Sequence, residues 1–182
     1  MVDASSWNIR RMQTEVGQWS RRNFPHNTRE EPLLGLIEET GELAHAVLKH
    51  RQGIRGTAAQ HNEAIVDALA DIFIYLLDYC DRSALEAEDL WRVASRGDQH
   101  DEGRSLFWAV RQLAWQVGLL AEVGDASPSA AAPLGEGVMR GLHLAARAAG
   151  CDLLGCVRRV LPSVLARDWT QNPHHGEAGH GG

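Results

Sequence analysis

Two consecutive stretches decide the fold of this chain: PLLGLIEETGELAHAVLK at residues 32–49 and EAIVDALADIFIYLLDYC at residues 63–80. In both, apolar residues recur at intervals of three and four, which is the period of a helix that buries one face. Neither stretch has a proline beyond its first position, and the β-branched alternation typical of strands is scarce. The two stretches therefore predict a pair of consecutive helices.

The same spacing recurs along almost the whole chain, which predicts an all-α fold packed as a helical bundle. Two stretches interrupt the pattern and are expected to be loops: the polar RGDQHDEGR from Arg96, and the proline-containing GDASPSAAAPLGEG from Gly124. The expected helices span residues 5–22, 32–50, 58–81, 84–95, 103–122, 133–149 and 152–167.

The chain divides into two helical halves, 1–95 and 103–170, followed by a polar tail at 171–182 that we expect to be disordered. The stretch from Pro32 aligns with SLFWAVRQLAWQVGLLAE from Ser105, which suggests a tandem repeat. In that alignment Glu38, Glu39 and Glu42 correspond to Arg111, Gln112 and Trp115. The second half would then be a degenerate copy that packs on the first as an internal partner.

Composition excludes several classes of protein. The formal charge of −6 and the lack of any Lys/Arg block argue against binding of a nucleic acid polymer. No apolar run approaches the length of a membrane span, and MVDASSWNIRR lacks an apolar signal core, so a cytoplasmic location is expected. Cys80, Cys151 and Cys156 are odd in number and lack CxxC spacing, which predicts buried thiols instead of a disulfide or zinc site.

Each of the deciding stretches carries acids on one side of its predicted helix. The first helix has an acidic arc formed by Glu38, Glu39 and Glu42, with Lys49 in the same arc. The second has four acids within about 80° of arc: Glu63, Asp67, Asp71 and Asp78. Away from its acids, the first helix has an expected core face of Leu33, Leu36, Ile37, Leu43, Ala44, Val47 and Leu48.

Acidic rows are usually solvated faces, and that is the simplest interpretation here. Two features favour a metal site instead. Basic residues are nearly missing from 63–78, and the rest of that helix is apolar, so unpaired carboxylates on it would be costly. Oxygen ligands suit Mg²⁺, with Mn²⁺ as the alternative ion. Because Mg²⁺ takes substrate phosphates as its remaining ligands, the acids predict a phosphorylated substrate.

The acids also resemble a known family, the MazG-like all-α nucleoside triphosphate pyrophosphohydrolases. Its hallmark is EExxE on one helix and ExxD on the next, and the residues from Glu38 to Glu42 match the first part in full. Asp71 fits the final acid of the second part, but Ala68 stands where the family has Glu, and Asp67 directly precedes it. The resemblance covers about residues 7–90, and RDWTQNP from Arg167 is similar to the basic-aromatic ending of such proteins.

The resemblance implies Mg²⁺-dependent cleavage of a nucleoside triphosphate, deoxy or ribo, into a nucleoside monophosphate and pyrophosphate, as in removal of unwanted nucleotides from the pool. It implies as catalytic metal ligands Glu38, Glu39, Glu42 and Asp71, with Asp67 as a fifth ligand. Candidates to hold the phosphates are Lys49, Arg55 and Arg167, and candidates to face the base are Trp19, Asn23 and Phe24. For Lys49 a solvated helix end, and for the aromatic residues core packing, are the simpler alternatives.

A competing hypothesis is a non-catalytic bundle that binds a nucleotide, a divalent ion or another protein. Ala68 is its main support, because the family's second-helix Glu is missing. The intact EExxE argues against it, since a structural module gains nothing from clustered glutamates. A homodimer is also expected, because the apolar, Trp-bearing helix at 105–121 offers a surface to a second chain.

Overall fold

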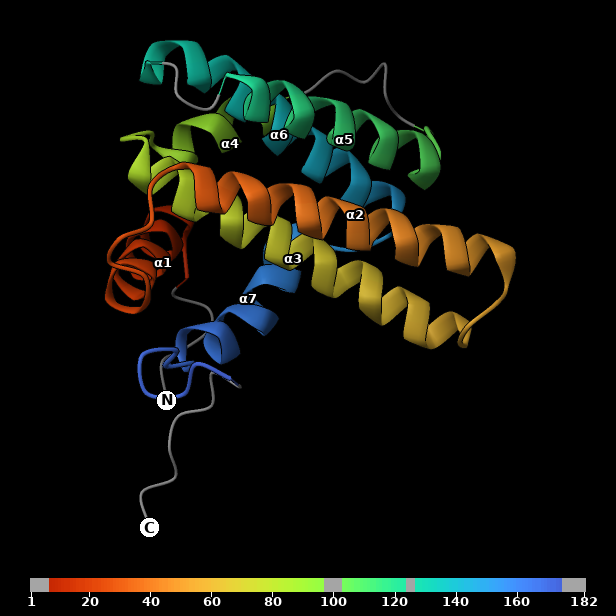
Figure 1. Cartoon of the computed structure of the whole chain (residues 1–182). Helices are drawn as coiled ribbons and strands as arrows, with labels where there is room; N and C mark the ends of the chain where they lie inside the picture. Colours follow the sequence, from red (N-terminus) through yellow and green to blue (C-terminus); the bar gives the residue numbers. More distant parts are fainter. Residues whose placement is uncertain (1–6, 97–102, 124–126, 175–182) are drawn as a thin grey trace.

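The computed structural model describes residues 7–96, 103–123 and 127–174, and these form helices and turns without a strand (Figure 1). The prediction of an all-α fold is therefore confirmed. The helices are α1 (Ile9–Asn23), α2 (Glu30–Gln52), α3 (Ala58–Arg82), α4 (Ala87–Ser95), α5 (Leu106–Glu122), α6 (Pro128–Ala148) and α7 (Leu153–Leu165).

The two deciding stretches form a long antiparallel hairpin of α2 and α3. Gly53 ends α2 in the left-handed conformation at φ 65°, which glycine adopts without strain. Thr57 then starts α3 with a capping box, because its hydroxyl accepts from the Gln60 amide and its own amide donates to the Gln60 side chain. Gly35 lets the helices approach, since a side chain there would collide with the Tyr75 ring.

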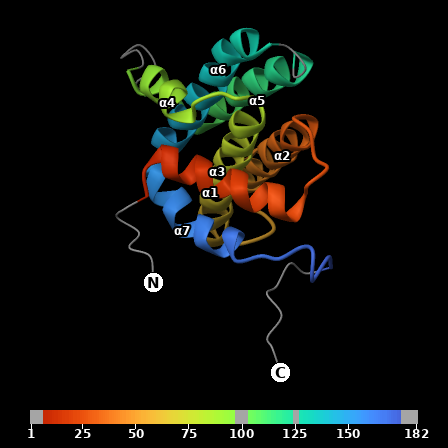
Figure 2. The ribbon, with the colours of Figure 1, turned by 90° about the vertical axis from the view of Figure 1, so that its left-hand side faces the viewer.

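Helix α3 is the centre of the molecule. The helices α1, α2, α6 and α7 all pack against it, and Figure 2 shows α1 crossing it with α7 alongside. Its fully buried side chains include Leu69, Ile72, Phe73, Leu76, Leu77, Tyr79 and Cys80. Cys80 is thus the buried thiol that was expected, as is Cys156, while Cys151 is partly exposed.

Helices α5 and α6 form a second hairpin, which packs through α5 on α2 and through α6 on α3. Gly141 permits the close approach, because a Cβ there would meet the Leu113 backbone at 3.0 Å. The second half therefore packs on both acidic helices. The repeat relationship itself stays a prediction.

Several local expectations need correction. Helix α6 begins at Pro128 and not at 133, because proline at the first helical position lacks only an amide that would be unpaired anyway. On α2, Ile37 and Leu48 are 47% and 42% exposed and Ala44 is also exposed, so these three do not belong to the core. The polar segment at 97–102 and the tail beyond His174 lie outside the described residues. Within the described residues no helix is long and apolar enough to cross a membrane.

Candidate functional site

Glu39 and Asp71 bring the acidic faces of α2 and α3 together. Burial raises the pKa of Glu39 to about 7, and the carboxylates of Asp71, Glu42 and Glu38 add to the shift. Burial likewise raises the pKa of Asp71 to about 6; Arg167 opposes this shift, and Asp67 and Glu42 add to it. Glu38 and Glu42 are exposed beside them. The predicted acids therefore act on one another as one negatively charged cluster.

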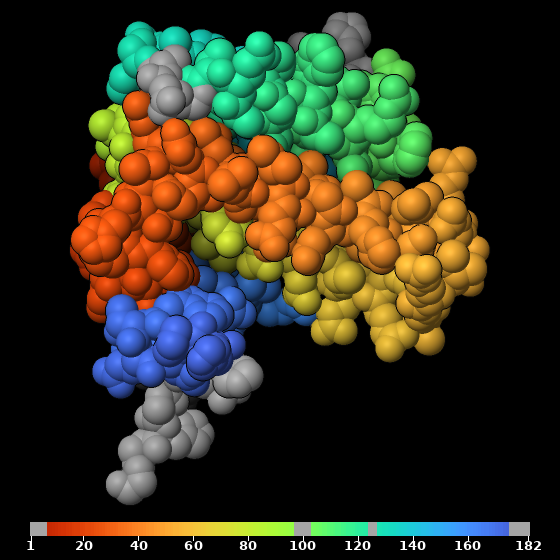
Figure 3. All heavy atoms as spheres, viewed as in Figure 1, coloured from red at the N-terminus to blue at the C-terminus, as the bar shows by residue number. Residues whose placement is uncertain are grey.

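A cavity of about 270 Å³ opens on one side of this cluster, where Figure 3 shows a hollow between α1, α2 and the C-terminal segment. Glu39 and Asp71 form part of its wall. Aromatic rings form much of the rest: Trp19, Phe24, Tyr75 and Trp169. A cavity lined by both carboxylates and flat rings suits a planar group attached to a charged one.

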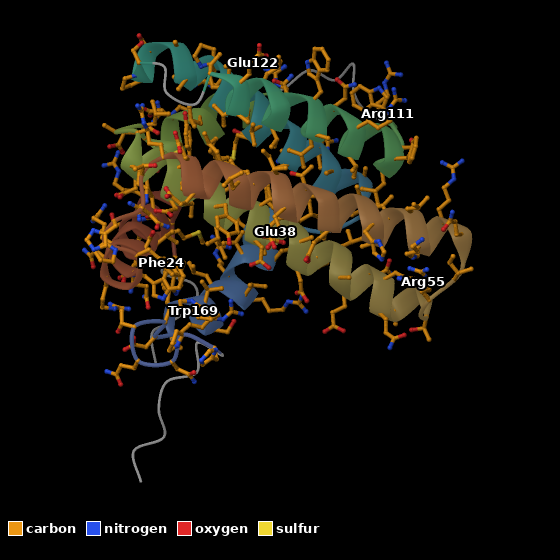
Figure 4. The ribbon with its side chains drawn as sticks, viewed as in Figure 1. Phe24, Glu38, Arg55, Arg111, Glu122 and Trp169 are labelled. Carbon is orange, nitrogen blue, oxygen red and sulfur yellow. The ribbon has the colours of Figure 1, made fainter. Side chains whose placement is uncertain are left out.

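The C-terminal segment closes this cavity through contacts with α1. The Trp19 indole donates to the Arg167 carbonyl at 2.9 Å, and the Trp169 amide donates to the Asn23 side-chain oxygen at 2.7 Å. The Asn23 amide group donates to the Trp19 carbonyl at 3.0 Å. Asn23 thus anchors the C-terminal segment and is not among the lining residues, whereas Trp19 and Arg167 line the cavity. Figure 4 shows Phe24 and Trp169 on this side of the molecule.

A separate groove of about 800 Å³ lies between the second half of α2 and the start of α3. Its walls carry Glu38, Glu42, His45, Lys49, Arg55 and His61. The structure therefore brings the predicted phosphate ligands Lys49 and Arg55 together, and places Arg167 on the opposite side of the acids. Figure 4 shows Glu38 at the middle of the hairpin and Arg55 at its tip.

Two further acids of α3 have basic partners: that of Asp67 lies on α7, and that of Asp78 lies on α3 itself. Asp67 accepts from Arg159 of α7 at 2.7 Å, and both side chains are about half exposed. Asp78 is buried and accepts from Arg82 at 3.1 Å and from the Ser20 hydroxyl at 2.8 Å. The acidic row predicted for this helix is thus divided: Asp71 belongs to the cluster, Asp78 to a buried ion pair, and Asp67 lies between.

The second hairpin has a groove of its own, about 300 Å³, between α5 and α6. Gln112 lines it, and the only carboxylate among its lining residues is Glu136. Trp115, which aligns with Glu42, is 63% exposed. The carboxylate cluster is therefore confined to the first half.

The cluster has the ligand chemistry for a hard cation, because the donors are all carboxylates and burial, with repulsion between the acids adding to it, raises the pKa of Glu39 and of Asp71. As placed, however, no group of three or more His, Cys, Asp or Glu side chains in the described part of the chain converges to hold a metal ion.

Comparison of the chain with protein-family models, with curated proteins and with solved structures finds no match. The resemblance to MazG-like proteins therefore stays a prediction from the sequence motifs. Sequence reasoning did not single out His61, Tyr75 or Asn27, which line the two hollows. Tyr75 shares the face of Asp71 one turn later, which is a signal that helical periodicity offers.

Proposed function

We propose that the protein is a Mg²⁺-dependent hydrolase that cleaves nucleoside triphosphates to nucleoside monophosphate and pyrophosphate. The observation that carries the proposal is the pair Glu39 and Asp71, whose carboxyls have raised pKa values between an aromatic cavity and a groove with basic residues. Half-buried carboxylates that repel one another are typical of a functional site in which a bound cation and a polyanionic ligand balance their charge.

The proposed roles follow from position. The base lies in the aromatic cavity against rings such as Trp19, and the phosphates extend over the carboxylates toward Lys49 and Arg55. The residues that would hold Mg²⁺ are Glu38, Glu39, Glu42 and Asp71, with Asp67 as a fifth ligand. When bound, the ion supplies a water of lowered pKa and neutralises charge on the phosphates. Arg167 lies near enough to Asp71 to oppose the rise of its pKa, and it offsets negative charge where the acidic cluster meets the aromatic cavity.

A homodimer and a cytoplasmic location are part of the proposal. Five of the seven large apolar side chains exposed among the described residues lie on the adjacent helices α2 and α5: Leu34, Ile37, Leu48, Phe107 and Trp115. A second copy of the chain would cover this surface.

The test is incubation with a panel of unmodified and modified nucleoside triphosphates plus Mg²⁺, with pyrophosphate and phosphate resolved by chromatography. We expect pyrophosphate and a monophosphate from at least one substrate, and loss of at least 100-fold in rate for Glu42→Gln. The matched control is Glu63→Gln, which removes an exposed acid of α3 outside the cluster and should retain full activity. Release of phosphate instead of pyrophosphate would contradict the proposal.

The second candidate, a non-catalytic binding module, is favoured by Ala68, which is buried where a family member has Glu. It predicts nucleotide binding without turnover in the same panel. Ala68→Glu then discriminates, because a restored carboxylate should create turnover in a module that lost it. An active wild-type chain would exclude this candidate.

A further inference from the structure

The groove near the tip of the α2–α3 hairpin contains a buried polar atom without a partner. His61 is 7% exposed, and its Nε2 has no hydrogen-bond partner within the described part of the chain. A buried imidazole nitrogen normally finds a donor or acceptor, since leaving it unpaired costs free energy. The side chain is nevertheless polar, on a helix whose other buried positions are mostly apolar.

The turn between the helices lies directly over this imidazole. A Cβ at Gly56 would come within 3.1 Å of His61 Cε1 and 3.4 Å of Nε2, and Gly56 itself has φ 145°, where side chains are strained. The His50 ring packs edge-on against His61 from α2, with ring centroids 6.1 Å apart. Residues 51–60 are all exposed, so the turn has room to move.

Positive charge surrounds the groove beside His61. Lys49 and Arg55 both line the groove. Arg55 has φ 60°, a left-handed conformation that is uncommon for a residue other than glycine. Helix α3, 25 residues long, directs the positive end of its dipole toward this turn. Lys49 lies two turns, about 10 Å along the helix, beyond the metal-ligand candidate Glu42.

We propose that this groove binds the pyrophosphate group, both as the end of the bound substrate and as the leaving product, and that His61 Nε2 donates a hydrogen bond to it beneath the Gly53–Gly56 turn. The inference rests on the proposed function, because it assigns the far end of that substrate. Lys49 and Arg55 neutralise the anion, and the two glycines let the turn lift to admit it. His61 is thus a substrate-positioning residue for the pyrophosphate group.

The experiment is calorimetric titration of inorganic pyrophosphate, with Mg²⁺ present, into the full chain and its variants. We expect wild-type binding, and affinity at least about tenfold weaker for His61→Leu and for Arg55→Ala. Arg51→Ala is the matched control: it removes the same charge two residues from Lys49, but its guanidinium packs on the Phe107 ring outside the groove, so affinity should not change.

Thermal unfolding without ligand separates this role from a structural one. Leucine fills a similar volume and removes the unpaired nitrogen, so His61→Leu should melt at the same or a higher temperature than wild type. A lower melting temperature would show that the His61 ring serves the fold, and either that result or equal pyrophosphate affinity in all variants would overturn the inference. If no nucleotide is cleaved but pyrophosphate binding depends on His61, the proposed function is wrong, whereas the groove is still supported as a pyrophosphate site. If nucleotides are cleaved but pyrophosphate affinity does not depend on His61, the proposed function is supported and the inference about the groove is wrong.

Discussion

Glu39 connects the electrostatics of the site to the stability of the fold. Its pKa is raised from 4.5 to about 7, and that of Asp71 from 3.8 to about 6, so the folded state binds protons more tightly than the unfolded state does. Stability therefore falls as pH rises through this window, from about 4 to about 7, and the full cost is present above it. A bound divalent cation would remove the cost.

We predict that Glu39→Gln stabilises the metal-free protein at pH 8 and leaves it unchanged at pH 4, where wild-type Glu39 is mostly protonated in both states. The gain should be on the order of 1 kcal/mol after allowance for solvent screening, or about 2–4 °C in Tm. Differential scanning calorimetry in EDTA at the two pH values measures it. Mg²⁺ should then raise the Tm of wild type at pH 8 and not that of Glu39→Gln.

The exposed acid Glu63 provides the control, because Glu63→Gln should change neither the pH dependence nor the response to Mg²⁺. If Glu39→Gln lowers the Tm at pH 8, the Glu39 carboxylate has a favourable partner in the metal-free protein and the cluster is not under repulsion.

At the scale of single residues, the sequence predicted which acids come together but not what neutralises the others. The scarcity of basic residues within 63–78 favoured a metal for the whole acidic row. The structure provides cations from outside residues 63–78: Arg82, one turn later on α3, for Asp78, and Arg159 of α7 for Asp67. Helical periodicity fixes the face on which an acid lies, whereas its partner depends on which distant helix packs there.

Among the elements, α1 and α3 are joined through Arg82, which also forms a buried i,i+4 ion pair with Asp78 within α3. The side chains of Arg82 and Asp78 are 9% and 12% exposed. Arg82 also donates to the Ser20 hydroxyl at 2.7 Å and to the Asn27 carbonyl at 2.5 Å, so one guanidinium holds α1, the following loop and α3. Ser20, Asn27 and Asp78 all line the aromatic cavity, so this network shapes the proposed base site.

We predict that Arg82→Leu destabilises the protein by about 3–5 kcal/mol, because it leaves Asp78 buried without a counter-charge. Chemical denaturation followed by circular dichroism measures the loss. Asp78→Leu combined with Arg82→Leu should recover part of it, since no charge then stays buried. Arg10→Leu, which breaks an exposed pair with Glu88, should cost at most about 1 kcal/mol. If Arg82→Leu costs no more stability than Arg10→Leu, the buried pair is not a structural link.

Element boundaries were largely predictable, and the exceptions have local causes. Caps such as Thr57 and the glycine at 53 fixed the ends of the α2–α3 hairpin, whereas the small residues after Pro128 had no periodicity to distinguish helix from loop. Which apolar residues of α2 would be buried was less predictable. Its contacts with α3 and α5 leave a stripe uncovered, and a single helix pattern cannot show how much of its surface the neighbours reach.

For the whole molecule, the all-α class followed from periodicity, and packing of the second half on the first was expected from the repeat alignment. Which helices of the two halves meet was not predictable, because several bundle topologies satisfy the same apolar faces. The observed pairing leaves α2 and α5 side by side at the surface (Figures 1 and 3). Leu34 and Trp115, on these two helices, are 65% and 63% exposed, the largest values among the exposed apolar side chains.

We therefore predict that the protein self-associates through the α2–α5 surface, with a mass in sedimentation equilibrium of twice the 20.0 kDa of the chain. Trp115→Lys places a charge at the most exposed aromatic ring of this surface and should return the protein to the mass of one chain, with the helical content unchanged by circular dichroism. Val93→Lys is the control, because Val93 is 39% exposed but lies on α4, away from these helices. A wild-type chain that sediments as a monomer at all concentrations would contradict the prediction, as would a dimer that Val93→Lys disrupts and Trp115→Lys does not.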